Sequence, residues 1–191
     1  NRIQSTARAI AMTDVLASLS VVATRYNYVK PHINEKGIIR KIMGIYPSWD
    51  GSDYHEQTAY TWSYDAYEVA DEDKKLAYSR IDRIKSSVDK DPDSSNSLYL
   101  QGHTTSHDPL VSAVFATDEQ LKKFPETVIV AAEYDYLRVG SDYAAKRLAS
   151  LGVPVRSIRY CGCDHGFLDM LGTIVQSEEL CLTIAAELKA L

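Results

Sequence analysis

Apolar positions follow two different spacings in the last third of the chain, and the two spacings alternate. A continuous apolar run covers Val128 to Ala132, and a second strand is expected over Val155 to Tyr160. The segment after each strand carries apolar residues on one helical face, namely Ala144, Leu148 and Leu151 in the first and Leu180, Ile184, Leu188 and Leu191 in the second. This alternation predicts an α/β fold with a parallel sheet and right-handed crossovers.

The same two patterns occur earlier in the chain. A helix is predicted near the start, where apolar residues recur at helical spacing: Met12, Val15, Leu16, Leu19 and Val22. The segment from Ile38 to Tyr46 is mostly apolar and stops at Pro47, which predicts a parallel strand buried on both faces. Residues 1–47 are therefore predicted to form the first helix and strand of the α/β core.

Between residues 48 and 107 the sequence becomes charged and aromatic. Two sets of residues fall at helical spacing in this region: Tyr60, Tyr64 and Tyr67, then Ala77, Ile81, Ile84 and Val88. We predict an inserted helical segment over 48–107, after which residues 108–191 form the C-terminal βαβα part of the core. The aromatic residues of the insert can fill a small core or line a ligand pocket, and the sequence leaves both open.

Composition excludes several classes of function. The chain has 191 residues, 45% of them hydrophobic, which suffices to bury a core without disulfides or a metal. A formal net charge of -5 with scattered basic residues argues against a nucleic-acid surface. No apolar run is long enough to cross a membrane, and no signal peptide is recognised. An odd number of cysteines, three, favours a reducing compartment, so a cytoplasmic location is expected.

An acid and a histidine stand at the ends of the two predicted strands in the last third. Asp135 follows the first strand and His165 the second, and in α/β proteins sites form where the carboxyl ends of parallel strands meet. A serine hydroxyl becomes a good nucleophile when an imidazole takes its proton, and the imidazole needs a carboxylate on its other nitrogen. We therefore expect Asp135 to orient His165, and His165 to act as general base and then general acid. Taken singly, each also has a purely structural explanation, as a helix cap and a loop residue.

Two motifs surround this pair. Residues 132–138 are Ala-Glu-Tyr-Asp-Tyr-Leu-Arg, and residues 160–167 are Tyr-Cys-Gly-Cys-Asp-His-Gly-Phe. Both resemble the acid and base motifs of the hormone-sensitive-lipase-like esterases of the α/β-hydrolase fold, the bacterial acetyl-esterase group. Ile45-Tyr46-Pro47 and Asp108-Pro109-Leu110 are similar to other segments of that family, and the resemblance extends from Ile38 to the C-terminus.

The resemblance implies a fold and an activity. The fold is the C-terminal part of an α/β-hydrolase parallel sheet with an inserted helical cap, and the tyrosine-rich insert lies where the family places the second part of its cap. The activity is hydrolysis of short-chain carboxylic esters through a serine acyl-enzyme, with Asp135 and His165 as acid and base. No cofactor and no metal are expected.

Two elements of the family pattern are missing from this sequence. The His-Gly-Gly motif, whose main-chain N–H groups bind the oxyanion, is absent, and so is a Gly-x-Ser-x-Gly nucleophile motif. The nearest candidate nucleophile is Ser5, but Ile3 and Ala7 replace both glycines and would crowd the strained turn. The alternative is that Ser5 starts a helix and that the nucleophile lies upstream of Asn1, in a longer protein.

Two further groups of potential ligands were considered. His103, His107 and Asp108 have a spacing that could bind zinc on a helix, but a glycine before them and a proline after them favour a loop, so no metal site is assigned. Cys161 and Cys163 make a weak metal or disulfide pair. They are interpreted as small apolar residues that pack beside the histidine turn.

Three functions therefore stay open. The chain is the C-terminal part of a serine carboxylesterase with a small-molecule ester substrate, or a non-catalytic binding or interaction module on a hydrolase scaffold, or part of a serine peptidase of the same fold. Few strands are predicted, so the sheet would leave an apolar edge open. Association with a second copy, as a homo-oligomer, or with the missing N-terminal part is expected. Neither a nucleic-acid nor a membrane partner is expected.

Overall fold

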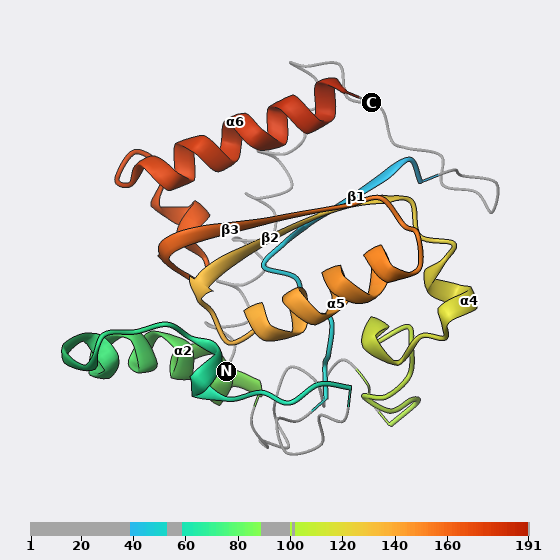
Figure 1. Cartoon of the computed structure of the whole chain (residues 1–191), viewed down its shortest axis with the longest axis horizontal. Coiled ribbons are helices and arrows are strands. Elements are labelled where there is room, and N and C mark those ends of the chain that lie inside the picture. Colours follow the sequence, from blue (N-terminus) through green and yellow to red (C-terminus); the bar gives the residue numbers. More distant parts are fainter. Residues whose placement is uncertain (1–38, 53–58, 89–99, 101, 191) are drawn as a thin grey trace, which may run out of the picture. The chain divides into compact units, whose positions relative to one another are not determined.

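A parallel sheet lies at the centre of the structure (Figure 1). The computed structural model describes residues 39–52, 59–88, 100 and 102–190. The strands run parallel in the spatial order β1 (Lys41–Ile45), β2 (Glu126–Tyr134) and β3 (Val155–Asp164). The helices are α2 (Lys74–Val88), α4 (Asp118–Leu121), α5 (Arg138–Ser150) and α6 (Val175–Lys189), with short 3₁₀ helices η2 (Tyr64–Ala66), η3 (Asp71–Asp73), η4 (Ala113–Phe115) and η5 (Phe167–Met170).

The central strand, β2, carries the core. Six consecutive residues of it are buried, and they enter two separate apolar clusters because successive side chains of a strand point to opposite faces. Val128 and Val130 pack with Leu180 of α6, whereas Ile129 packs with Leu148 of α5. The two helices therefore cover opposite faces of the sheet (Figure 1).

The predicted elements of the last third are confirmed, with both strands longer than expected. Ala144 and Leu148 of α5 are both buried. The helix is followed by Gly152 at a φ of +84°, a conformation that glycine adopts without strain. β3 continues past the predicted end, because its final residues still pair with β2, with Asp164 opposite Tyr134.

Two burial predictions are wrong. β1 was predicted to be buried on both faces, but every residue of it is only half-buried, since among the described residues β1 pairs with β2 alone. Leu188 was predicted to face inward from α6, but it is 64% exposed. Glu187 takes the inward position, where its carboxylate binds Lys41 of β1 at 2.7 Å and Arg156 of β3 at 2.5 Å. The hydrogen bond from Lys41 lowers the pKa of Glu187.

The first part of the insert is not the helix that was predicted. Tyr60 precedes an irregular stretch, and η2 is the one helical turn between Tyr60 and Tyr67. η2 begins at Ser63, whose hydroxyl accepts a hydrogen bond from the Asp65 N–H at 3.1 Å. Tyr64 and Tyr67 therefore do not share a helical face with Tyr60. Their positions follow from ring packing, not from helical spacing.

An aromatic cluster fills the interior of the insert. Its buried members are Trp62, Tyr67, Ile81 and Tyr136, and the Trp62 ring lies 5.3 Å from the Tyr136 ring. Ile81 belongs to α2, which confirms a helix there, and Tyr136 directly follows β2. The aromatic residues thus form a small core that joins the insert to the end of the central strand.

Some expectations lie beyond what the structure describes or stay untested. The helix predicted over Met12 to Val22 lies outside the described residues, and so does Leu191. The division of the chain at residues 47 and 107 stays a prediction. Among the described residues, no helix is both long and apolar enough to span a membrane.

Leu148→Ala tests the packing of α5 on the sheet. Leu148 is 1% exposed in the cluster around Ile129, so truncation leaves a cavity and should lower the free energy of unfolding by about 2–5 kcal/mol. Leu182 is the matched control, because it lies on α6 but is 72% exposed. Leu182→Ala should change the same quantity by less than about 0.5 kcal/mol. Urea unfolding followed by circular dichroism measures both, and equal losses would contradict the packing.

Candidate active site

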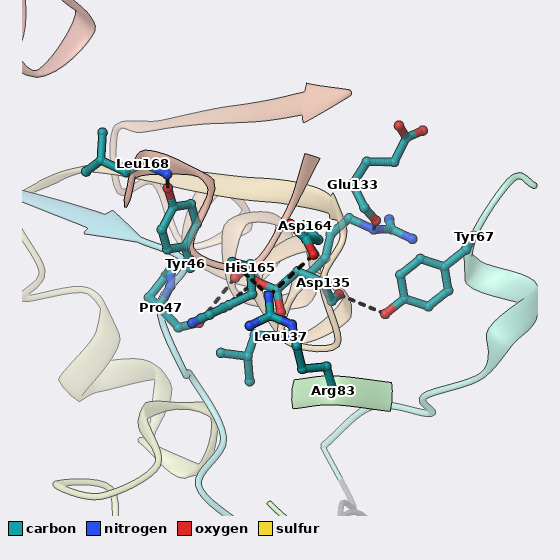
Figure 2. A network of polar contacts seen from close by, with 12 residues as sticks. Tyr46, Pro47, Tyr67, Arg83, Glu133, Asp135, Leu137, Asp164, His165 and Leu168 are labelled. Atoms are coloured by element: carbon teal, nitrogen blue, oxygen red, sulfur yellow. Dashed lines mark hydrogen bonds and ion pairs between the residues drawn. The ribbon is translucent and has the colours of Figure 1, made fainter. Parts of the chain in front are cut away.

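The ends of β2 and β3 bring the predicted acid and base together. Tyr134 pairs with Asp164 in the parallel register, so the next residue of each segment, Asp135 and His165, leaves the sheet beside the other. His165 Nδ1 lies 2.8 Å from Asp135 Oδ2, although 30 residues separate them in the chain (Figure 2). The structure therefore places the two sequence-predicted site residues in direct contact.

The Asp135 carboxylate is buried and has a donor for each oxygen. The residue is 1% exposed. Oδ1 accepts a hydrogen bond from the Leu137 N–H at 3.0 Å, at the turn that leads into α5, and Oδ2 accepts from the His165 ring. Asp135 thus fixes the turn that precedes α5 and holds the His165 ring by its other oxygen.

The His165 side chain lies at the surface of the same site. Its side chain is 29% exposed, against 1% for that of Asp135. An ionised carboxylate can only accept a hydrogen bond, so Nδ1 carries the hydrogen of the neutral ring and Nε2 keeps its lone pair. The hydrogen bond that the structure shows for the ring runs through Nδ1. Nε2 is therefore the ring nitrogen that faces away from the Asp135 contact.

Tyr46 lines the site, and it was not predicted from the sequence as a site residue. It directly follows β1, and its ring centroid lies 5.2 Å from those of both His165 and Phe167. Its hydroxyl oxygen accepts a hydrogen bond from the Leu168 N–H at 2.9 Å. Burial raises the pKa of Tyr46 to about 12. Its φ of +48° is rare for a bulky residue, and no sequence pattern signals it.

A buried arginine secures the turn that carries Asp135. Arg138 is 5% exposed, and its Nε donates to the Glu133 main-chain oxygen at 3.0 Å. Its Nη1 pairs with Asp142 at 2.9 Å, and its Nη2 donates to the Ala66 main-chain oxygen. The guanidinium also lies over the Tyr67 ring, 4.4 Å from the centroid. Arg138 therefore joins the acid turn to the insert.

Glu133 and Tyr67 complete the support of the two strand ends. Glu133 Oε2 accepts a hydrogen bond from the Gly162 N–H at 2.7 Å, which joins the end of β2 to that of β3. The Tyr67 hydroxyl donates to the Asp135 main-chain oxygen at 2.9 Å (Figure 2). It also accepts a hydrogen bond from Trp62 Nε1 at 3.2 Å. The sequence motif contained Glu133 and Arg138, but their roles depend on contacts with distant segments.

Open space adjoins the base. A hollow of about 610 Å³ is lined in part by Tyr46, His165 and Asp169. A neighbouring hollow of about 400 Å³ has a more apolar lining that includes Leu76 of α2 and Phe167. His165 can therefore be reached from outside the fold, which a general base requires.

The other candidates of the sequence are not brought to this site. Ser5 lies outside the described residues. His103 and His107 are exposed, and the Asp108 carboxylate accepts hydrogen bonds from Leu110 N–H at 2.9 Å and Thr104 Oγ1 at 2.7 Å. These bonds lower the pKa of Asp108. Across the described ranges, no three His, Cys, Asp or Glu side chains are grouped as metal ligands would be.

The two neighbouring cysteines differ in burial. Cys163 is 4% exposed and packs in the cluster with Phe167 and Leu180, and burial raises the pKa of its thiol. Cys161 is exposed. Both are free thiols, and the interpretation as packing residues is correct for Cys163 alone.

Comparison with known proteins adds a family to this geometry. A protein-family model described as an alpha/beta hydrolase fold matches residues 17–169. An arylesterase from Saccharolobus solfataricus is 36% identical over 92 residues, which are 48% of this chain and 28% of that protein. A protein of Acanthamoeba polyphaga mimivirus described as an alpha/beta hydrolase is 38% identical over 76 residues, 40% of this chain and 22% of that protein.

Solved structures show the same arrangement of strands and helices. A hyperthermophilic esterase from the archaeon Pyrobaculum calidifontis aligns with a TM-score of 0.54 at 19% identity, over 89% of this chain and 47% of that chain. At this identity the likeness concerns the fold alone. The matched region is less than half of the length of each of these three proteins.

Tyrosine ionisation tests the burial of the rings around the site. Burial raises the pKa of Tyr46 to about 12, and the pKa values of Tyr60 and Tyr67 rise as well, from an ordinary value of 10.0. The folded state then binds more protons than the unfolded state, so the stability from these groups is complete below pH 10.0 and is lost as the pH rises through the folded values. Tyrosinate absorbance should therefore show a late step that coincides with loss of circular dichroism.

The urea-unfolded chain is the control for this titration. There all 13 tyrosines should ionise together near the ordinary pKa. The same single step in the folded chain, with unchanged circular dichroism, would contradict the burial of these rings.

Proposed function

Because the chain belongs to the α/β-hydrolase family, in its hormone-sensitive-lipase-like branch, we propose that it supplies the acid and the base of a carboxylic ester hydrolase. One observation carries this proposal. A buried Asp135 carboxylate contacts His165 Nδ1 at 2.8 Å, while His165 lines an open hollow of about 610 Å³. A general base needs both an orienting partner and access to a reacting group.

The family resemblance and the predicted fold class are confirmed. The family model covers most of the chain, and the sheet has the parallel strands and flanking helices expected of the C-terminal part of an α/β-hydrolase. The catalytic roles of Asp135 and His165, the serine and the substrate remain proposals.

The proposed mechanism is acyl transfer through a serine. His165 Nε2 takes the proton of the serine hydroxyl as its oxygen attacks the ester carbonyl, and Asp135 stabilises the imidazolium that forms. The imidazolium then gives its proton to the leaving alcohol, and a water molecule activated by the same base releases the acid. Short-chain acyl esters are the proposed substrates. Ser5 or a residue upstream of Asn1 is the proposed nucleophile, and the oxyanion donors are assigned to segments other than the described residues.

Location and association follow from the same proposal. We infer a cytoplasmic location from the free thiols of Cys161, Cys163 and Cys181. Within the described sheet β1 pairs on one side only, and its half-buried apolar residues favour association with a second copy or with an N-terminal part of a longer protein.

His165→Ala tests the proposed activity in the protein that carries this chain. Loss of the base should lower kcat for a short-chain aryl ester by about three orders of magnitude or more, and it should abolish labelling by a fluorophosphonate probe. Asp135→Asn should have a smaller effect on kcat. Circular dichroism checks that each variant is folded.

His103→Ala is the matched control, because His103 is exposed in a loop away from the pair. It should leave both labelling and turnover unchanged. Equal activity in the His165 and His103 variants would refute the triad assignment, and a protein that is never labelled would favour the non-catalytic module. Faster turnover of peptides than of esters would favour the peptidase. Mass mapping of the labelled serine separates Ser5 from an upstream residue.

A further inference from the structure

We propose that Arg83, on helix α2 of the insert, is a positioning residue for His165. The proposal rests on the proposed function of His165 as the general base. Arg83 Nη2 donates a hydrogen bond to the main-chain oxygen of His165 at 2.6 Å. Figure 2 shows this side chain reaching from α2 to the turn that carries the base.

The main-chain oxygen of His165 lies just beyond the hydrogen bonds of the sheet. β3 ends one residue earlier, and Gly166 leaves the strand direction at a φ of +83°. Arg83 donates to the His165 main-chain oxygen, and within the described residues no main-chain N–H does so. The insert therefore supplies the contact that fixes this peptide group.

An exposed ion pair with Asp164 is the competing explanation of Arg83. Arg80 Nη1 and Arg83 Nη2 both lie 3.4 Å from Asp164 Oδ2, and their side chains are 55% and 51% exposed. Exposed ion pairs contribute little to stability. The two arginines differ in one respect, because of the two only Arg83 donates a hydrogen bond to His165. This bond, at 2.6 Å, is shorter than the 3.4 Å contact between Arg80 and Asp164. A bond from a charged donor is stronger than one between neutral groups.

Packing holds helix α2 in place, so the backbone that carries Arg83 is anchored. Ala77 and Ile81 of the helix are buried, and Ile81 packs in the cluster with Trp62 and Tyr136. The same insert reaches the acid through the Tyr67 hydroxyl, which donates to the Asp135 main-chain oxygen at 2.9 Å. The insert thus contacts the main chain of Asp135 through Tyr67 and that of His165 through Arg83, and loss of Arg83 removes only the second contact.

This arrangement predicts a defect in catalysis, not in substrate binding. Without the bond from Arg83, the turn can move His165 out of line with Asp135 and with the reacting hydroxyl. Small misplacements of a catalytic group lower the reaction rate strongly. Arg83→Met, which keeps the length of the side chain but removes its donors, should lower kcat by about tenfold to hundredfold with KM changed less than about twofold.

The experiment compares Arg83→Met with Arg80→Met in the same protein. Arg80→Met removes the same charge from the same Asp164 carboxylate but no bond to His165, so its effect on kcat should be much smaller. Arg83→Lys keeps a donor and should recover part of the loss. A second measurement follows the downfield Nδ1–H resonance of His165, assigned by its absence in His165→Ala. This signal should broaden and exchange faster with water in Arg83→Met only.

Each result decides one question. Equal effects of Arg83→Met and Arg80→Met on kcat and on the His165 signal would overturn the proposal. A change in KM with kcat intact in Arg83→Met would also overturn it, since that result indicates a substrate contact. The resonance does not depend on turnover. If the protein hydrolyses no ester, a selective change of this signal in Arg83→Met still supports the positioning role, and an unchanged signal refutes it.

Discussion

The hydrogen bond between Asp135 and His165 involves a buried carboxylate, that of Asp135. The need to keep this carboxylate hydrogen-bonded constrains most of the surrounding structure. Moving an ionised carboxylate out of water costs several kcal/mol unless strong hydrogen bonds replace the lost solvation. At 1% exposure, Asp135 meets this condition through the Leu137 N–H and the His165 ring. A slip of β3 by one residue would turn His165 to the other face of the sheet. The β2–β3 register, the turn into α5 and the Asp135–His165 hydrogen bond therefore depend on one another.

The insert contacts the main chain of both Asp135 and His165. Arg138, Tyr67 and Trp62 join the acid turn to residues that precede α2, through bonds to main-chain oxygens and through ring contacts. These main-chain bonds fix where the backbone of Asp135 lies, which a bond to its carboxylate alone could not do. The insert thereby takes part in setting the geometry of the Asp135–His165 pair.

The two ends of the sheet have different chemistry. At the amino ends of the strands, Glu187 of α6 pairs with Lys41 of β1 and Arg156 of β3, and Lys41 also pairs with Glu126 of β2. At the carboxyl ends stand Tyr46, Asp135 and His165, one after each strand. Helix α6 is thus tied to the sheet at the end away from the site. The ion pairs can stabilise the sheet there without changing the charge next to the base.

The sequence by itself determined the alternation of strands and helices in the last third, the family, and the positions of Asp135 and His165 at two strand ends. These follow from local periodicity and short motifs, which report which face of an element is buried. Periodicity does not show which other residues a given side chain contacts. The irregular path of Tyr60 to Tyr67 was decided by aromatic packing, and the inward position of Glu187 by Lys41 and Arg156. The positive φ of Tyr46 and the bond from Arg83 to His165 were likewise decided by tertiary structure, because each needs a contact between segments far apart in the chain.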